Sequence, residues 1–158
     1  MSELPLLGAA MPFDVLETLQ DFIVNEHRDL ELQDFCVPGV LDDDWKPIAD
    51  RAKELLSGYR GRLGIHGPFW GLHIASPDRE IQKVVTRRMM QGLDVCEHLS
   101  ATQMVIHSPY ITWDYNNLDN APGRQAYQAV LDHAHATLDE VVRRAEEIGV
   151  TMVVENIM

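Results

Sequence analysis

The sequence is poor in cysteine and has no long apolar segment. It holds 2 cysteines among 158 residues, Cys36 and Cys96, and their separation matches no metal-binding spacing. This excludes a disulfide-stabilised scaffold, and we interpret both as small apolar side chains of a cytoplasmic protein. No apolar run approaches the roughly 18 residues that a membrane helix needs. The first 13 residues contain no Lys or Arg, so we expect neither a secretory signal nor a membrane span.

Basic residues are also scarce. The chain has 13 Lys and Arg against 25 Asp and Glu, a formal charge of −12. Such a surface repels phosphate backbones unless a local basic patch overrides it. The only adjacent basic pairs, Arg87-Arg88 and Arg143-Arg144, fall in segments with helical periodicity, where solvated faces are usual. We therefore do not expect a nucleic acid partner.

The sequence does contain short apolar runs that alternate with longer amphipathic ones. We predict strands at residues 4–10, 29–35, 62–66, 103–107 and 151–155, and helices at 14–26, 44–57, 76–99 and 123–148. Near-continuous apolar strands are typical of parallel sheets covered on both faces. Alternating strands and helices predict one α/β domain over residues 1–158, with chemistry at the carboxyl ends of the strands.

Helix boundary signals accompany these segments. The acidic run at 42–44 is suited to cap the second helix, and Ser76-Pro77 has the form of an N-cap followed by proline at the first helical position. Gly58 and Gly149 follow the second and fourth helices as candidate stop signals.

A short motif is repeated at two predicted strand ends. Residues 65–69 read Ile-His-Gly-Pro-Phe, and residues 106–110 read Ile-His-Ser-Pro-Tyr. In the same frame the fifth strand ends at Glu155. Equivalent positions on neighbouring parallel strands lie about 4.8 Å apart, so we expect His66, His107 and Glu155 to converge. Imidazole and carboxylate groups are natural ligands for Zn²⁺ or Mn²⁺, which predicts a divalent metal site. The alternative is that the repeat reflects turn geometry alone.

These motifs, together with Val-Val-Glu-Asn at 153–156 and Leu-Glu-Leu-Gln at 30–33, resemble the xylose-isomerase-like TIM-barrel superfamily. The resemblance implies an α/β fold made of the N-terminal five strands and four helices of a (β/α)₈ barrel, truncated after strand five. A complete barrel needs roughly 200 to 250 residues. The alternative fold is a flavodoxin-like domain, which would normally close with a helix after the fifth strand.

The resemblance also implies an activity. It indicates a metal-dependent sugar or sugar-phosphate isomerase or epimerase that transfers a proton next to a carbonyl and acts on a small carbohydrate. Glu155 is then a catalytic residue and a metal ligand, while His66 and His107 bind the metal or the substrate. The implied ion is Zn, Mn or Mg. The remaining ligands and the second catalytic carboxylate come from strands six to eight, so the 158 residues alone are expected to be inactive.

Two alternatives stay open. In the endonuclease IV-like branch, which cleaves abasic DNA, residues that match His66, His107 and Glu155 are zinc ligands, although the charge of −12 argues against it. The other is an inactive barrel fragment that assembles with a partner or forms a homo-oligomer through its open edge strands.

Other candidate residues follow the third and fourth strands. Trp70, His73 and Trp113 are expected on the loops of the active face, where aromatic groups stack on sugars. Packing of these loops is an equally good interpretation. For Glu31 and Asp34 on the second strand, a salt bridge is favoured over a place in the site.

Overall fold

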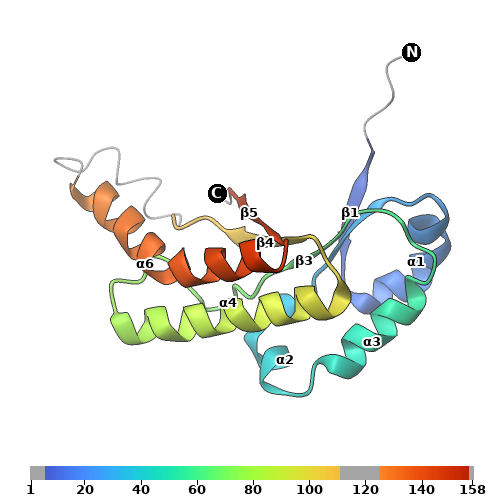
Figure 1. The fold of residues 1–158 in the computed structure, drawn as a ribbon, viewed down its shortest axis with the longest axis horizontal. Coiled ribbons are helices and arrows are strands. Elements are labelled where there is room, and N and C mark those ends of the chain that lie inside the picture. The colour runs from blue at the N-terminus through green and yellow to red at the C-terminus, as the bar shows by residue number, and fades with distance from the viewer. Residues whose placement is uncertain (1–5, 111–124, 157–158) are drawn as a thin grey trace, which may run out of the picture.

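The computed structural model describes residues 6–110 and 125–156, which form a parallel five-stranded sheet in the order β1-β2-β3-β4-β5 (Figure 1). The strands are β1 (Gly8–Met11), β2 (Asp29–Leu32), β3 (Leu63–His66), β4 (Gln103–His107) and β5 (Thr151–Glu155). The helices are α1 (Phe13–Asn25), η1 (Asp34–Cys36), α2 (Pro38–Asp42), α3 (Lys46–Leu55), α4 (Arg79–Leu99) and α6 (Gln125–Glu147). Parallel strands with helical connections confirm the predicted α/β class.

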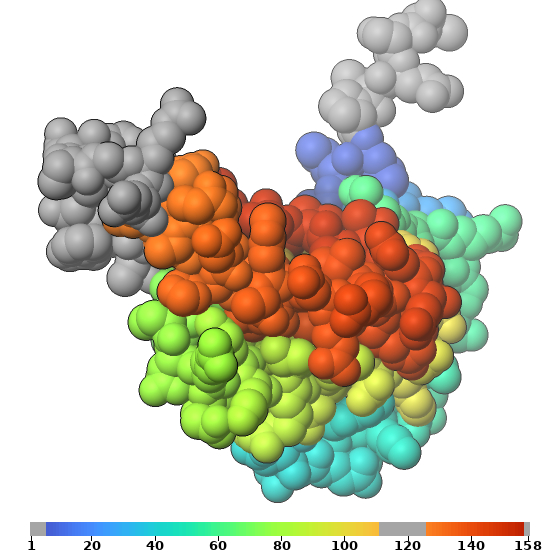
Figure 2. All heavy atoms as spheres, turned by 60° about the vertical axis from the view of Figure 1, so that its left-hand side comes forward, coloured from blue at the N-terminus to red at the C-terminus, as the bar shows by residue number. Residues whose placement is uncertain are grey.

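The core lies between one face of the sheet and the helices. Apolar residues of β2, β3 and β4 point to this face. Several of them are fully buried together with apolar side chains of α1 and α4, namely Leu30, Leu32, Ile65, Met104, Leu16, Ile23, Val85, Met89 and Leu93. The helices α4 and α6 pack side by side along this layer (Figures 1 and 2). Because side chains alternate along a strand, the residues between the apolar ones, including Glu31, Gly64 and His66, point to the opposite face.

The predicted bounds of the first two strands differ from those in the structure. β1 runs from Gly8 to Met11 rather than over residues 4–10, of which residues 4 and 5 lie outside the described part. β2 ends at Leu32 instead of residue 35, because Asp34–Cys36 forms the short helix η1. The helix α2 was not predicted, since five residues are too few to display a 3.6-residue period.

Helix starts were also misassigned, whereas the glycine stops were correct. The N-cap of α4 is Asp78, whose carboxylate accepts the N–H groups of Glu80 and Ile81, so Ser76 and Pro77 lie before the helix. Trp45 precedes α3 without a side-chain cap, although the predicted caps were residues 42–44. Gly58 and Gly149 have φ values of 83° and 72°, the left-handed conformation that glycine adopts most easily.

The edges of the sheet are formed by β1 and β5. On β5, Val153 and Val154 are 39% and 57% exposed, so this strand is less covered than β3 or β4. The two cysteines are unpaired. Cys96 is buried as a small apolar side chain would be, whereas Cys36 is only partly buried, contrary to our expectation for both. Within residues 6–110 and 125–156, no helix combines the length and the apolar character that crossing a membrane requires.

Candidate metal site

The carboxyl edge of the sheet brings together the three residues that the repeated motif singled out. His66, His107 and Glu155 are the last residues of β3, β4 and β5. The register pairs His66 with Val105 and His107 with Glu155, so all three side chains leave the sheet on one face. Parallel pairing therefore brings the three groups together, as expected from their equivalent positions at the ends of neighbouring strands.

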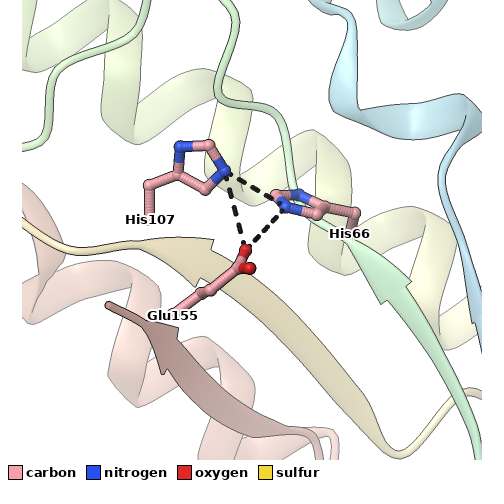
Figure 3. Close-up of side chains that lie close together, drawn as sticks. All are labelled: His66, His107 and Glu155. Atoms are coloured by element: carbon pink, nitrogen blue, oxygen red, sulfur yellow. Dashed lines mark hydrogen bonds and ion pairs between the residues drawn. The ribbon is translucent and has the colours of Figure 1, made fainter. Parts of the chain in front are cut away.

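Their reactive atoms form a compact triangle (Figure 3). The Nε2 atoms of His66 and His107 are 3.2 Å apart. Oε2 of Glu155 lies 3.5 Å from Nε2 of His66 and 3.9 Å from Nε2 of His107. The histidine on β3 is buried, whereas the side chain of Glu155 is 52% exposed. The triangle therefore opens to solvent on the side of the carboxylate.

The hydrogen bond at the other ring nitrogen sets the tautomer of His66. Its Nδ1 lies 2.9 Å from the carbonyl oxygen of Gly67, and because a carbonyl can only accept, Nδ1 carries the proton. In the neutral ring the Nε2 lone pair then points into the triangle. Burial lowers the pKa of His107, the neighbouring His66 lowers it further, and Glu155 opposes both effects. The lowered pKa favours the neutral ring of His107, which can offer a lone pair at Nε2.

This donor set fits a divalent metal ion. A tetrahedral zinc centre with bonds of 2.0–2.1 Å separates its ligand atoms by about 3.3 Å, and the three observed separations run from 3.2 to 3.9 Å. All ligand atoms lie within 4.8 Å of one another. Two imidazole lone pairs that face each other at 3.2 Å repel unless a proton or a cation lies between them. A cation held by these atoms removes that repulsion and neutralises the carboxylate.

Aromatic side chains line the same edge. The ring of Phe69 stacks on His107 with centroids 3.8 Å apart, and Trp70 stacks on Phe69 at 5.3 Å. Trp70 is 61% exposed, so its outer surface is open to a ligand. His73 is less available, because its Nε2 donates to the carbonyl oxygen of Pro109 at 2.9 Å and joins the loops after β3 and β4. Trp113 lies outside the described residues.

Glu31 lies closer to the candidate site than the sequence indicated. Burial raises the pKa of this carboxyl, His66 lowers it, and Glu155 raises it, so Glu31 lies within electrostatic reach of the triangle. In the described part of the chain neither Glu31 nor Asp34 forms a salt bridge, contrary to our expectation. Asp34 instead accepts the N–H of Phe13 at 2.8 Å. The signal for Glu31 was its place between Leu30 and Leu32, which point to the core.

Comparison with known proteins agrees with this architecture. Residues 27–158 match the family model of the xylose isomerase-like TIM barrel. The uncharacterized protein MJ1311 of Methanocaldococcus jannaschii is 26% identical over 103 residues, which are 65% of this chain and 32% of that protein.

Two solved structures share the fold. The TTHB071 protein from Thermus thermophilus, studied after soaking with zinc chloride, is 26% identical with a TM-score of 0.70, and the match covers 95% of this chain and 55% of that one. A D-tagatose 3-epimerase-like protein is 22% identical with a TM-score of 0.67, and the match covers 97% and 53%. The chain thus spans about half the length of these solved proteins.

Proposed function

The chain belongs to the xylose isomerase-like TIM-barrel family, and from that premise we propose that the protein is a metal-dependent sugar or sugar-phosphate isomerase or epimerase. The observation that carries the proposal is the convergence of His66, His107 and Glu155 at the carboxyl edge of the sheet. Solved proteins of similar fold include sugar epimerases such as D-psicose 3-epimerase and L-ribulose 3-epimerase.

In this proposal His66 and His107 hold the metal through Nε2, and Glu155 holds it through Oε2. A bound divalent ion supplies Lewis-acid chemistry, which polarises the oxygens of a carbonyl substrate. The hydrogen bond from Nδ1 of His66 to the carbonyl oxygen of Gly67 leaves Nε2 as the ring nitrogen that can bind a metal. The exposed side of the Glu155 carboxylate remains accessible to a substrate that approaches from solvent.

Proton transfer is the step that we assign to Glu155. The carboxylate takes the proton from the carbon next to the substrate carbonyl, and a proton then returns to the neighbouring carbon in an isomerase or to the opposite face of the same carbon in an epimerase. The second case needs a second acid–base group. We expect that group and further metal ligands on other strands of a complete barrel, so the 158 residues alone should not turn over substrate.

The aromatic pair after β3 is suited to bind the sugar. Trp70 has an exposed ring, and this ring stacks on Phe69, which in turn contacts His107 of the triangle. We assign Trp70 to stacking on a carbohydrate face and His73 to holding the loop through Pro109, with its Nδ1 left for a substrate hydroxyl. Trp113 is proposed to line the same pocket, and a free carbohydrate in the cytoplasm is the proposed substrate.

The second candidate function is an endonuclease IV-like zinc phosphodiesterase. The pair of histidines 3.2 Å apart favours it, because two imidazoles and a carboxylate form a typical zinc donor set. The excess of 25 acidic over 13 basic residues argues against binding a DNA backbone. Metal stoichiometry separates the two candidates, since three zinc ions per natural full-length protein favour the nuclease and one ion favours the isomerase.

The decisive experiment follows exchange of carbon-bound protons. The natural full-length protein, loaded with Mn²⁺ or Zn²⁺, is incubated in D₂O with ketoses and their phosphates, and NMR detects deuterium entering next to the carbonyl. We expect exchange with at least one sugar and its loss in Glu155→Gln. Metal-dependent cleavage of an abasic oligonucleotide without any sugar exchange would refute the proposal in favour of the nuclease.

A further inference from the structure

The two histidines of the triangle differ in what fixes their rings. His66 donates Nδ1–H to the carbonyl oxygen of Gly67. Among residues 6–110 and 125–156, the polar contacts of His107 are those of its Nε2, and no hydrogen bond is formed at its Nδ1. Histidine ligands of metals almost always use their second nitrogen for such a bond, which fixes the direction of the ring. Another group must therefore orient the ring of His107.

Phe69 is in the right place to do so. Its ring lies nearly parallel to His107, with an interplanar angle of 28° and centroids 3.8 Å apart. The same ring contacts His66 at 4.7 Å with a tilt of 48°. One phenyl group thus contacts both imidazoles, and a rotation of His107 about its terminal torsion would break the stacked contact. The χ2 torsion of an isolated histidine has a broad energy minimum, and the stacked contact with Phe69 narrows the range of angles that His107 can adopt.

The position of Phe69 is itself fixed from two sides. Its backbone N–H donates to the carbonyl oxygen of Cys36 at the end of η1, over 3.0 Å. The phenyl ring also stacks on the indole ring of Trp70. Further along the same loop, His73 donates to the carbonyl oxygen of Pro109. The loop after β3 is therefore attached to the segments that follow β2 and β4, which fixes the backbone from which the phenyl ring extends.

We propose that Phe69 is a positioning residue for the metal site, which holds Nε2 of His107 toward Nε2 of His66 in place of the missing hydrogen bond at Nδ1. The inference rests on the proposed function in so far as the triangle binds a metal. The ring acts through His107 and does not touch the ion. The second copy of the repeated motif also has an aromatic residue, Tyr110, at the position that corresponds to Phe69.

The test compares metal affinity in variants of the 158-residue chain. Phe69→Leu keeps an apolar side chain and removes the ring, Phe69→Tyr keeps the ring, and Phe22→Leu is the control, because Phe22 lies on α1 and is 42% exposed. Zn²⁺ binding is measured by competition with a chromophoric chelator, and Co²⁺ absorption reports the geometry. We expect Phe69→Leu to bind about 10- to 100-fold more weakly, with Phe69→Tyr and Phe22→Leu within about threefold of the wild type.

A second measurement needs no metal. The stack predicts upfield ring-current shifts of the His107 ring protons in the NMR spectrum of the wild type, retained in Phe69→Tyr and lost in Phe69→Leu. Circular dichroism confirms that each variant is folded. If the wild type binds metal and Phe69→Leu binds equally well, the positioning role is wrong while the proposed function stands. Absence of the ring-current shift refutes the stack itself, and a wild type that shows the shift without binding Zn²⁺ refutes a metal site formed by these three side chains alone.

Discussion

His107 and Glu155 are register partners at the ends of β4 and β5, and Oε2 of the carboxylate lies 3.9 Å from Nε2 of the imidazole. Backbone hydrogen bonds between two strands thus position two of the three candidate ligands. The third, His66, ends the next strand along the sheet. Because rigid strands rather than loops carry all three groups, the geometry of the triangle depends on the sheet itself.

Removing one ligand should abolish tight metal binding. We expect His107→Ala to weaken Zn²⁺ binding by more than about 100-fold, because a lost ligand exceeds the cost of a lost supporting contact. Isothermal titration calorimetry measures the change. The control is His135→Ala, which removes an exposed histidine of α6. Equal affinities of the two variants would show that the metal is bound elsewhere.

Gly64 should tolerate alanine only when Gln103 is shortened. A Cβ atom at Gly64 would lie 2.3 Å from Cγ of Gln103 on the neighbouring strand. We expect Gly64→Ala to lower the free energy of unfolding by about 1–3 kcal/mol, measured by urea denaturation.

The matched variant is the double substitution Gly64→Ala with Gln103→Ala. Its unfolding free energy should agree with that of Gln103→Ala alone within about 0.5 kcal/mol. If the double variant is as unstable as the sum of both losses, the clash with Gln103 is not the cause.

Tyr59 should make the free energy of unfolding depend on pH in the alkaline range. Its hydroxyl lies within hydrogen-bonding distance of the carbonyl oxygens of Arg28 and Arg62, and burial raises its pKa from 10.0 to about 12. In the unfolded chain the phenol ionises near pH 10, whereas in the folded chain it stays protonated to about 12. The stabilisation is therefore complete below pH 10 and is lost between pH 10 and about 12.

Tyr59→Phe tests this dependence. We expect the variant to be less stable by about 1–3 kcal/mol at pH 8, since carbonyl groups lose their donor, and to lose less stability than the wild type between pH 10 and 11. Urea denaturation at several pH values measures both effects. Tyr127→Phe, at a 47% exposed position, is the control. Parallel pH profiles of wild type and Tyr59→Phe would contradict the assignment.

Asp78 should be the main cap of α4. Its Oδ1 accepts the N–H of Glu80 at 2.8 Å and that of Ile81 at 3.4 Å. We expect Asp78→Ala to reduce the free energy of unfolding by about 1 kcal/mol. Asp78→Asn should retain most of this capping contribution, because asparagine also accepts N–H groups at an N-cap. Asp44→Ala is the comparison, because Asp44 accepts a single N–H at 3.3 Å, and it should cost less. A larger loss at Asp44 would reverse the assignment of these caps.

Long helices were predicted more accurately than short ones. The long segments that became α4 and α6 were predicted within three residues at the described ends, because many apolar positions at a 3.6-residue period define them. The short helix α2 and the turn η1 escaped prediction, since three to five residues carry no period. Within α4, the apolar residues Ile81 and Val84 are 46% and 39% exposed, because the apolar stripe of this helix is wider than its contact with the core.

The candidate site shows the same division. The repeated Ile-His-x-Pro-aromatic motif and the parallel frame identified His66, His107 and Glu155, since strand period and parallel pairing leave little freedom at a strand end. The contact of Phe69 with His107 depends on the path of a loop, which no periodicity describes. The same holds for the bond from His73 to Pro109, a contact across 36 residues.

The sequence by itself determined the order of strands and helices, the parallel pairing and the identity of three side chains at one edge, because these follow from local periodicity and from the restricted ways in which such elements connect. Only the tertiary structure decided the tautomer of His66, the partial burial of Glu31 within electrostatic reach of the triangle and the stacking of Phe69 on His107. Those properties arise from distances of a few ångströms between residues far apart in the chain, and only the packed molecule fixes such distances.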